Sequence, residues 1–396
     1  MLSVDYVRSR GSHYPVYRDR NRVGAADRLS EANARGAMDA LQSSLGCPAG
    51  PAGVACSIRA GATIEDYAAY GLGSGEGASA EAPSVFAFPG RDPRFNKMVF
   101  AGWDGRSSYD GLQVALRGRL PDIGRVVRDW TVTGSYALSR YEAETDDRVF
   151  GNVGGDTTSN DDPARLAGPA GFDRLHNLNV AMTFQVPGGV RLSSIWRAMS
   201  PLPQSLRVPV AMGSSAEIFY TDFEGDGTVG DLLPGTRRGS YGRDAGCGAE
   251  AVNQRIDAFN AQYAGTLTPA GRSLVAAGLF TEAQLQALGA VIPPVPRAPA
   301  GQVCLDWFLT TDLRISRPFK IAKGRVTIEP ALEVFNLFNT SNYDLPGFRM
   351  LPYLSGAAGT VNGTTPDNRP NRAGYTGGPF ALGTPRSWQL LARVSF

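Results

Sequence analysis

The feature that most constrains this chain is an alternation of apolar and polar residues over segments of about ten residues. The clearest segment is 177–186, where the even-numbered residues from Leu178 to Val186 are apolar and the odd-numbered ones from Asn177 to Gln185 are polar or small. A period of two predicts a β-strand with one apolar face. About ten residues also suffice to cross a bilayer as a tilted strand.

The same pattern recurs along the chain and predicts about eight strands. They lie near 2–8 and at 111–120, 129–139, 177–186, 190–197, 309–315, 325–334 and 388–396. The connections alternate in length. Short turns join 119 to 130, 187 to 189 and 320 to 324, whereas 10–95, 143–171, 200–302 and 339–386 are long loops. Such an alternation is typical of an outer-membrane barrel, with the short turns in the periplasm.

We therefore predict an all-β fold for residues 1–396: an antiparallel transmembrane β-barrel fragment of about eight strands with long extracellular loops. A small helical insertion is expected at about 251–289. Ala251–Gln262 is amphipathic, Thr268 and Pro269 suit an N-cap and the first helical position, and Thr281 to Gln284 has the spacing of a capping box.

Bulk properties exclude several classes of protein. The sequence has no run of about 18 apolar residues, so it predicts no transmembrane helix. This criterion does not detect a β-barrel, because only alternate residues of its strands face lipid. A net charge of +2 gives no basic field for nucleic acid. The N-terminus, residues 1–8, has neither a basic region followed by an apolar core nor a cleavage site, so we expect a chain that begins inside a longer parent.

One segment resembles a known family of outer-membrane proteins. Residues 333–343, Glu-Val-Phe-Asn-Leu-Phe-Asn-Thr-Ser-Asn-Tyr, are similar to the Asn-Leu-Phe-Asp segment near the end of TonB-dependent receptors, with Asn339 in place of the usual Asp. Pro385-Arg386 and a final strand closing on Phe396 follow at the expected distance. Residues 172–180 and 108–113 resemble strand segments of the receptors of this type that carry a carboxypeptidase-regulatory-like domain.

The resemblance implies the barrel portion of a TonB-dependent receptor for uptake of a bulky nutrient, located in the Gram-negative outer membrane and without plug and signal peptide. The implied partners are outer-membrane lipid, the outer-membrane insertion machinery, an extracellular ligand, and the TonB system only through the missing N-terminal part. The terminal strand resembles the assembly signal that the insertion machinery reads, carried by Trp388, Leu390, Val394 and Phe396.

Two alternatives belong to other classes. One is a small structural or adhesive eight-stranded barrel, because eight strands can close and fill their interior with side chains. The other is a secreted soluble β-sandwich that binds carbohydrate.

Catalysis is not expected. No Ser-His-Asp order or nucleophile elbow occurs, and we interpret Glu329 and Glu333 as polar groups of the barrel interior. We interpret His176 as lining the extracellular end of a strand. Five aromatic residues are predicted to belong to the girdles at the membrane interfaces: Trp130, Tyr136, Trp196, Trp388 and Phe396.

The four cysteines lie in polar loops and in no C-x-x-C arrangement. We predict two disulfides in an oxidising compartment, Cys47–Cys56 and Cys247–Cys304. The alternative is four unpaired thiols in a cytosolic fold.

The sharpest local motif is an acidic loop at 222–231. Asp222, Glu224 and Asp226 place oxygen donors at positions 1, 3 and 5 of a calcium loop, Gly227 follows at position 6, and Thr228 supplies a carbonyl at position 7. Position 12 is Leu233, so the bidentate acid that usually closes such a loop is missing. We expect Asp231, at position 10, to take its place. The alternative is a solvated acidic loop.

The prediction for this loop is a structural calcium ion bound with a dissociation constant of about 10⁻⁴–10⁻³ M, the range of extracellular sites. Calorimetry on a peptide spanning residues 214–241 checks it. Asp222→Ala and Asp226→Ala should each weaken binding. No calcium heat at millimolar concentration, or equal binding by the variants, would contradict the prediction.

Overall fold

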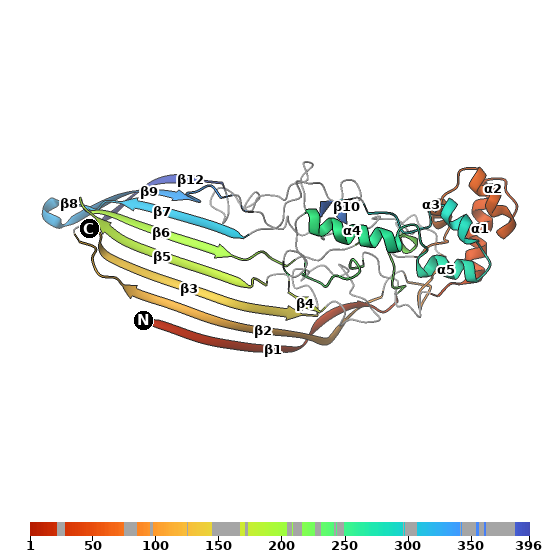
Figure 1. Ribbon diagram of the computed structural model, residues 1–396, viewed down its shortest axis with the longest axis horizontal. Coiled ribbons are helices and arrows are strands. Elements are labelled where there is room, and N and C mark those ends of the chain that lie inside the picture. Colours follow the sequence, from red (N-terminus) through yellow and green to blue (C-terminus); the bar gives the residue numbers. More distant parts are fainter. Residues whose placement is uncertain are drawn as a thin grey trace.

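The computed structural model describes residues 1–21, 28–74, 85–95, 98–124, 126–144, 167–170, 173–203, 208, 216–225, 231–240, 243, 249–295, 297, 307–340, 342, 354–355, 360–361 and 385–396. Within them, eight antiparallel strands form one curved sheet in the order β1-β2-β3-β5-β6-β7-β9-β12 (Figure 1). The predicted all-β antiparallel fold is confirmed. The sheet is not closed, because in the described residues β1 pairs with β2 and β12 with β9 but not with each other.

The strand bounds are β1 (Leu2–Asp19), β2 (Val99–Arg119), β3 (Arg128–Ala143), β5 (His176–Val186), β6 (Val190–Met199), β7 (Phe308–Ser316), β9 (Val326–Phe335) and β12 (Ser387–Ser395). Two short strands extend this sheet: β4 (Gly168–Pro169) pairs with β3 and β8 (Phe319–Ile321) pairs with β9. Leu354–Ser355 (β10) and Thr360–Val361 (β11) form a separate pair. No helix in the described residues is long and apolar enough to cross a membrane.

The first two strands extend well past their predicted ends. We expected a strand near 2–8 and a loop from residue 10, but β1 reaches Asp19 and β2 begins at Val99. The alternation fails there for two reasons. Register shifts between Ser12 and Val16 change which side chains share a face. Residues 104–110 of β2 are mostly polar or glycine, so the apolar face ends before this part of the strand.

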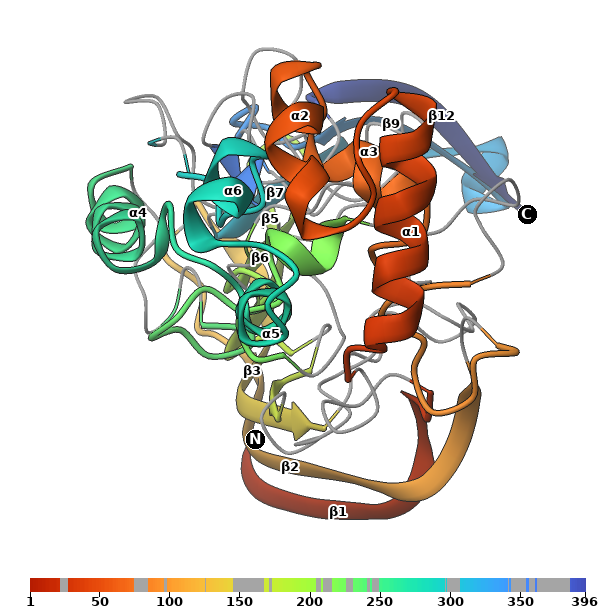
Figure 2. The same ribbon diagram turned by 90° about the vertical axis from the view of Figure 1, so that its right-hand side faces the viewer.

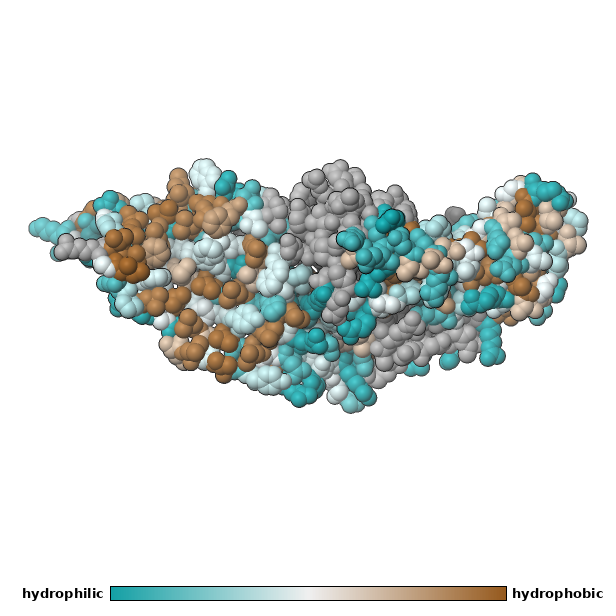
Figure 3. All heavy atoms as spheres, in the orientation of Figure 1, coloured by the Kyte–Doolittle hydropathy of each residue, from teal (hydrophilic) through white to brown (hydrophobic). Residues whose placement is uncertain are grey.

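The register gathers most of the large apolar residues of the eight strands on one face. Leu2 lies opposite Leu116, Leu112 opposite Leu138, and Leu390 opposite Leu332. Many of these side chains are exposed, and Figure 3 shows hydrophobic residues gathered over the strand half of the molecule. A contiguous exposed apolar surface of this extent marks a contact with lipid or protein.

All the long connections leave the sheet at one end, and the short turns lie at the other (Figure 1). Three predicted helices are present: α4 (Ala249–Tyr263), α5 (Pro269–Ala276) with Thr268 as N-cap, and α6 (Glu282–Ala287) with a capping box between Thr281 and Gln284. The first long loop also contains helices that were not predicted: α1 (Glu31–Ser44), α2 (Val54–Arg59) and α3 (Ile64–Ala69).

Helices from the two loops pack together into what we call the helical cap: α1, α2, α3, α5, α6 and the short helix Glu217–Phe219 (Figure 2). Its core contains fully buried side chains from both loops, namely Met38, Ile64, Tyr67, Leu72, Phe219, Leu274, Leu279 and Leu285. Burying one such side chain contributes about 1.5–3 kcal/mol. The two loops therefore form one small folded unit at the end of the sheet.

A charge on the apolar face should destabilise the protein in the membrane. Val180 lies in the middle of β5 on the apolar face, whereas its neighbour Ala181 points to the opposite face. We expect Val180→Arg to lower the free energy of unfolding in lipid vesicles by about 2–4 kcal/mol. Ala181→Arg is the matched control and should have little effect. Urea unfolding checks this, and equal losses in both variants would contradict the assignment of the faces.

Candidate functional site

The concave face of the sheet carries charged side chains that pair with one another. Arg197 lies 2.7 Å from the carboxylate of Asp312, and Arg314 lies 2.7 Å from that of Glu333. Arg191 and Arg314 both approach Glu329, at 3.7 and 3.8 Å. The two glutamates thus lie on the inner face, each beside a cation. The face combines partly exposed cations and carboxylates, a lining that can hydrogen-bond a polar solute.

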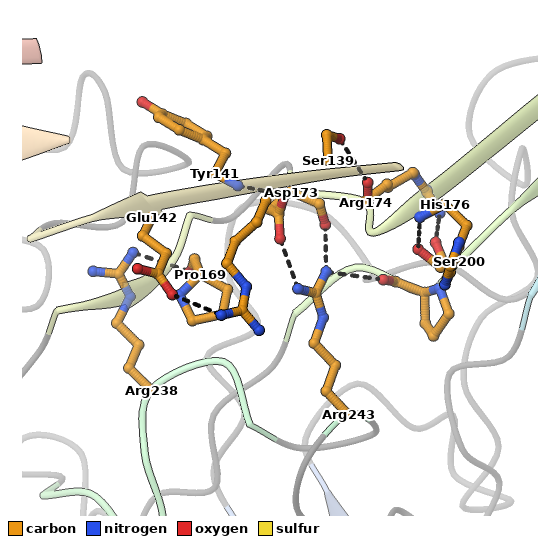
Figure 4. Close-up of polar contacts among 12 residues, drawn as sticks. Ser139, Tyr141, Glu142, Pro169, Asp173, Arg174, His176, Ser200, Arg238 and Arg243 are labelled. Carbon is orange, nitrogen blue, oxygen red and sulfur yellow. Dashed lines mark hydrogen bonds and ion pairs between the residues drawn. The ribbon is translucent and has the colours of Figure 1, made fainter. Parts of the chain in front are cut away.

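A second polar group, which we call the polar clamp, ties the 200–307 loop to the ends of β3 and β5. Arg243 donates to the Asp173 carboxylate at 2.6 Å and to the Asp173 carbonyl at 2.7 Å (Figure 4). The other carboxylate oxygen of Asp173 accepts from the backbone N–H of Tyr141 at 2.8 Å. The Asp173 side chain is 1% exposed and that of Arg243 13%. Few charges lie so deep unless they are paired.

Arg238 completes the polar clamp from the same loop. Its buried guanidinium donates to the carbonyls of Ala143, at 3.2 Å, and Pro169, at 3.3 Å. A Cβ on Gly168 would lie 2.8 Å from the Arg238 carbonyl oxygen, so glycine permits this close approach. Two loop arginines therefore satisfy backbone and side-chain acceptors at the loop end of the strands.

Next to the clamp, His176 lies between two aromatic rings at the loop end of the apolar face. Its ring stacks on Tyr136, with centroids 6.2 Å apart, and on Trp307, at 5.5 Å. The Tyr136 hydroxyl lies 2.8 Å from His176 Nδ1. At the short-turn end, Trp130 packs against Phe184 at 6.3 Å. Aromatic residues thus occur at both ends of the apolar band, the arrangement expected of interfacial girdles.

The helical cap is held together by contacts between the two loops. Tyr67 of α3 packs edge-on against Phe280, with centroids 5.3 Å apart, and its hydroxyl lies 2.6 Å from Ser57 Oγ. The Ile64 N–H donates to the Leu288 carbonyl at 2.8 Å. Burial and the adjacent Glu65 carboxylate of α3 raise the pKa of Tyr220 well above its usual range.

One predicted disulfide is present. Cys47 and Cys56 are bonded, with Cα atoms 5.7 Å apart, and the bridge joins the end of α1 to α2. Closing this small loop contributes about 2–3 kcal/mol in the chain-entropy description. Cys247 and Cys304 lie outside the described residues, so their pairing stays a prediction.

The acidic loop is described only in part, since Asp226 and Thr228 lie outside the described residues. The Asp222 carboxylate accepts from the Gly225 N–H at 2.5 Å, and the Asp231 carboxylate accepts from the Phe223 N–H at 2.9 Å. No group of three or more potential ligands occurs within the described residues. These contacts are turn and loop-closing hydrogen bonds, and the calcium site, including Glu224, stays a prediction.

The segment that carries the family resemblance forms the turn that ends β9. Asn336 adopts a left-handed backbone with φ of 48°, and its side chain exchanges hydrogen bonds with the backbone of Thr340. The Asn342 side chain accepts a hydrogen bond from the Leu309 N–H and donates one to the Leu309 carbonyl, and so continues the ladder. Asn339, which stands for the usual Asp, accepts from the Arg386 N–H at 3.1 Å. Asparagine tolerates the left-handed region and supplies both a donor and an acceptor.

The helices of the first loop were not predicted, although the sequence contains signals for two of them. Ser30 caps α1, and Thr63 with Asp66 forms a capping box at α3. For the polar clamp no such signal exists. Asp173 and Arg243 are 70 residues apart, and no spacing or periodicity in the sequence connects them.

Breaking the polar clamp should loosen the 200–307 loop without affecting the sheet. Arg243→Leu leaves the buried Asp173 carboxylate unpaired, a change that costs about 3–5 kcal/mol in buried pairs. We expect cleavage of this loop by proteinase K to become at least about tenfold faster. Arg297→Leu is the control, since it removes a 67% exposed side chain paired with exposed Asp257. Equal cleavage rates in both variants would refute the role of the clamp.

Comparison with known proteins agrees with this architecture. A family model described as "Outer membrane beta barrel domain" matches residues 1–372. Among solved structures, the chain is similar to the outer membrane transporter YddB from Escherichia coli, with a TM-score of 0.37 and 8% sequence identity. That match covers 76% of this chain and 27% of the transporter chain. No curated protein matches the sequence significantly. With a family match over most of its length, this chain belongs to the outer membrane beta barrel domain family, and it is located in the outer membrane.

Proposed function

We propose that the chain is the barrel portion of a TonB-dependent outer-membrane receptor that takes up a bulky nutrient. The observation that carries this proposal is the helical cap, an ordered unit with its own core at the loop end of a sheet whose concave face is polar. Binding residues are often placed on loops that a rigid scaffold positions. A bulky ligand would contact the cap first and then the charged concave face.

The resemblance of residues 333–343 to the terminal segment of TonB-dependent receptors supports energy-coupled uptake over passive diffusion. The proposal assigns coupling to the TonB system to another part of the receptor. The chain itself contributes ligand contacts and lipid contacts, and the proposal gives it no catalytic step. Nucleic acid is not among the proposed partners.

Growth of a gene-deletion strain tests the proposal. With siderophore-bound iron, oligosaccharides or peptides supplied as the sole nutrient source, we expect lost growth on at least one of them and the same loss in a strain without TonB. The full gene should restore growth, whereas a gene lacking residues 28–74, the first half of the cap, should not, at equal membrane yield. Unchanged growth on all of them, or uptake that does not need TonB, would contradict the proposal.

Refolding the chain alone tests the competing small barrel. A closed eight-stranded barrel would show heat-modifiable migration on a gel, because it resists detergent until heated. The open sheet predicts no such shift. A heat-modifiable form of the isolated chain would favour the structural or adhesive alternative.

We also propose that β12 is the signal read by the insertion machinery. Its outward side chains are exposed at an edge of the described sheet, and Phe396 is fully exposed. The set consists of Trp388, Leu390, Val394 and Phe396. Phe396→Ala should lower the amount of protein in the membrane fraction, with Ser395→Ala as the control. An unchanged amount would count against this role.

A further inference from the structure

The connection between β7 and β9 reaches farther than the neighbouring turn. Arg191, directly after the β5–β6 turn at Pro187–Gly189, pairs with Ser316. The end of β7 at Ser316 therefore lies level with this turn. Past the level of Ser316, β8 continues the hydrogen-bonded ladder with β9, from Phe319 opposite Ile328 to Ile321 opposite Val326. The resulting hairpin tip projects past the other short turns at the left of Figure 1. It therefore lies beyond the central part of the lipid-facing band.

The outward face of this tip is apolar. Phe319 and Ile321 are 43% and 46% exposed, and their register places them on the face of Ile328. On the other side of β9, Ile328 is opposite Val394 of β12. The apolar surface of the tip is thus continuous with the face that meets lipid.

The same tip is strongly basic. Residues Arg317–Arg325 contain four cations, Arg317, Lys320, Lys323 and Arg325, and no acidic residue. All four are exposed, and within the described part of the chain none makes an ion pair. The Arg317 guanidinium carbon lies 4.8 Å from the centre of the Phe319 ring, a cation–π contact. By contrast, the cation Arg119 beside the β2–β3 turn is paired with Asp129.

We propose that the tip, residues Arg317–Arg325, lies in the headgroup region of the leaflet at the short-turn end and binds anionic phospholipid through these four cations. Apolar side chains next to long basic ones suit this region, because the ring and aliphatic groups enter the acyl boundary while the charges reach the phosphates. Each Lys or Arg near an anionic surface strengthens the attraction to it about fivefold. The continuous apolar face supplies the membrane contact, and the unpaired charges select the headgroup.

Photo-crosslinking on the full chain tests this inference. Benzoylphenylalanine in place of Phe319 keeps an aromatic side chain at the tip, and the protein is placed in phosphatidylcholine nanodiscs that contain a minority of phosphatidylglycerol. Mass spectrometry of the adducts should show phosphatidylglycerol enriched over its share of the bilayer. In K320Q/K323Q/R325Q the enrichment should fall at least about fivefold, while phosphatidylcholine adducts remain.

R35Q/R59Q/R297Q is the matched control, since it removes three exposed cations from the loop end. It should leave the enrichment unchanged. No enrichment in the unsubstituted background, or equal enrichment in the tip variant, would overturn the proposal. An adduct with a protein in place of lipid, when the same experiment is done in outer-membrane vesicles, would also overturn it and would assign the tip to a protein partner.

Discussion

The hydrogen-bonded ladder of the antiparallel sheet is the constraint on which the rest of the structure depends. Lipid offers no partner for a backbone N–H or C=O, so each strand must satisfy these groups on its neighbours. The register from β1 to β12 does this on both sides of the six strands between the two edges and, as a consequence, sends alternate side chains to opposite faces. One face then meets lipid, and the other is free to carry the charges of Arg197, Asp312, Arg314 and Glu333.

Once the strands leave the lipid, this constraint ends and a different one takes over. Loops of such length can remain in water, but the described parts of two of them bury apolar side chains against each other. The helical cap follows the rules of a small soluble domain, with N-caps, edge-to-face aromatic contacts and a disulfide between Cys47 and Cys56. The polar clamp joins the sheet to the loop that contributes to the cap, because Arg243 and Arg238 donate to acceptors at the strand ends that have no partner in the ladder.

Much of the sheet could be predicted from the sequence, and the errors have a common cause. The interior strands, such as β5 and β6, were located almost to the residue because lipid enforces their alternation. The outer ends of β1 and β2 were missed because water imposes no such pattern and the bulge near Ser12 changes the phase. The short helices α5 and α6 were found from their caps, whereas α1 to α3 were not recognised despite the capping box at Thr63.

The sequence by itself determined the class of fold, the outward face of the strands and the side of the sheet that carries the long loops. It could do so because a period of two is a local property of the sequence: alternate residues of a strand face opposite environments. Only the tertiary structure decided that the two loops share one core and that Asp173 meets Arg243. Contacts between residues so far apart leave no periodic trace, since they depend on how the loops fold back over the sheet.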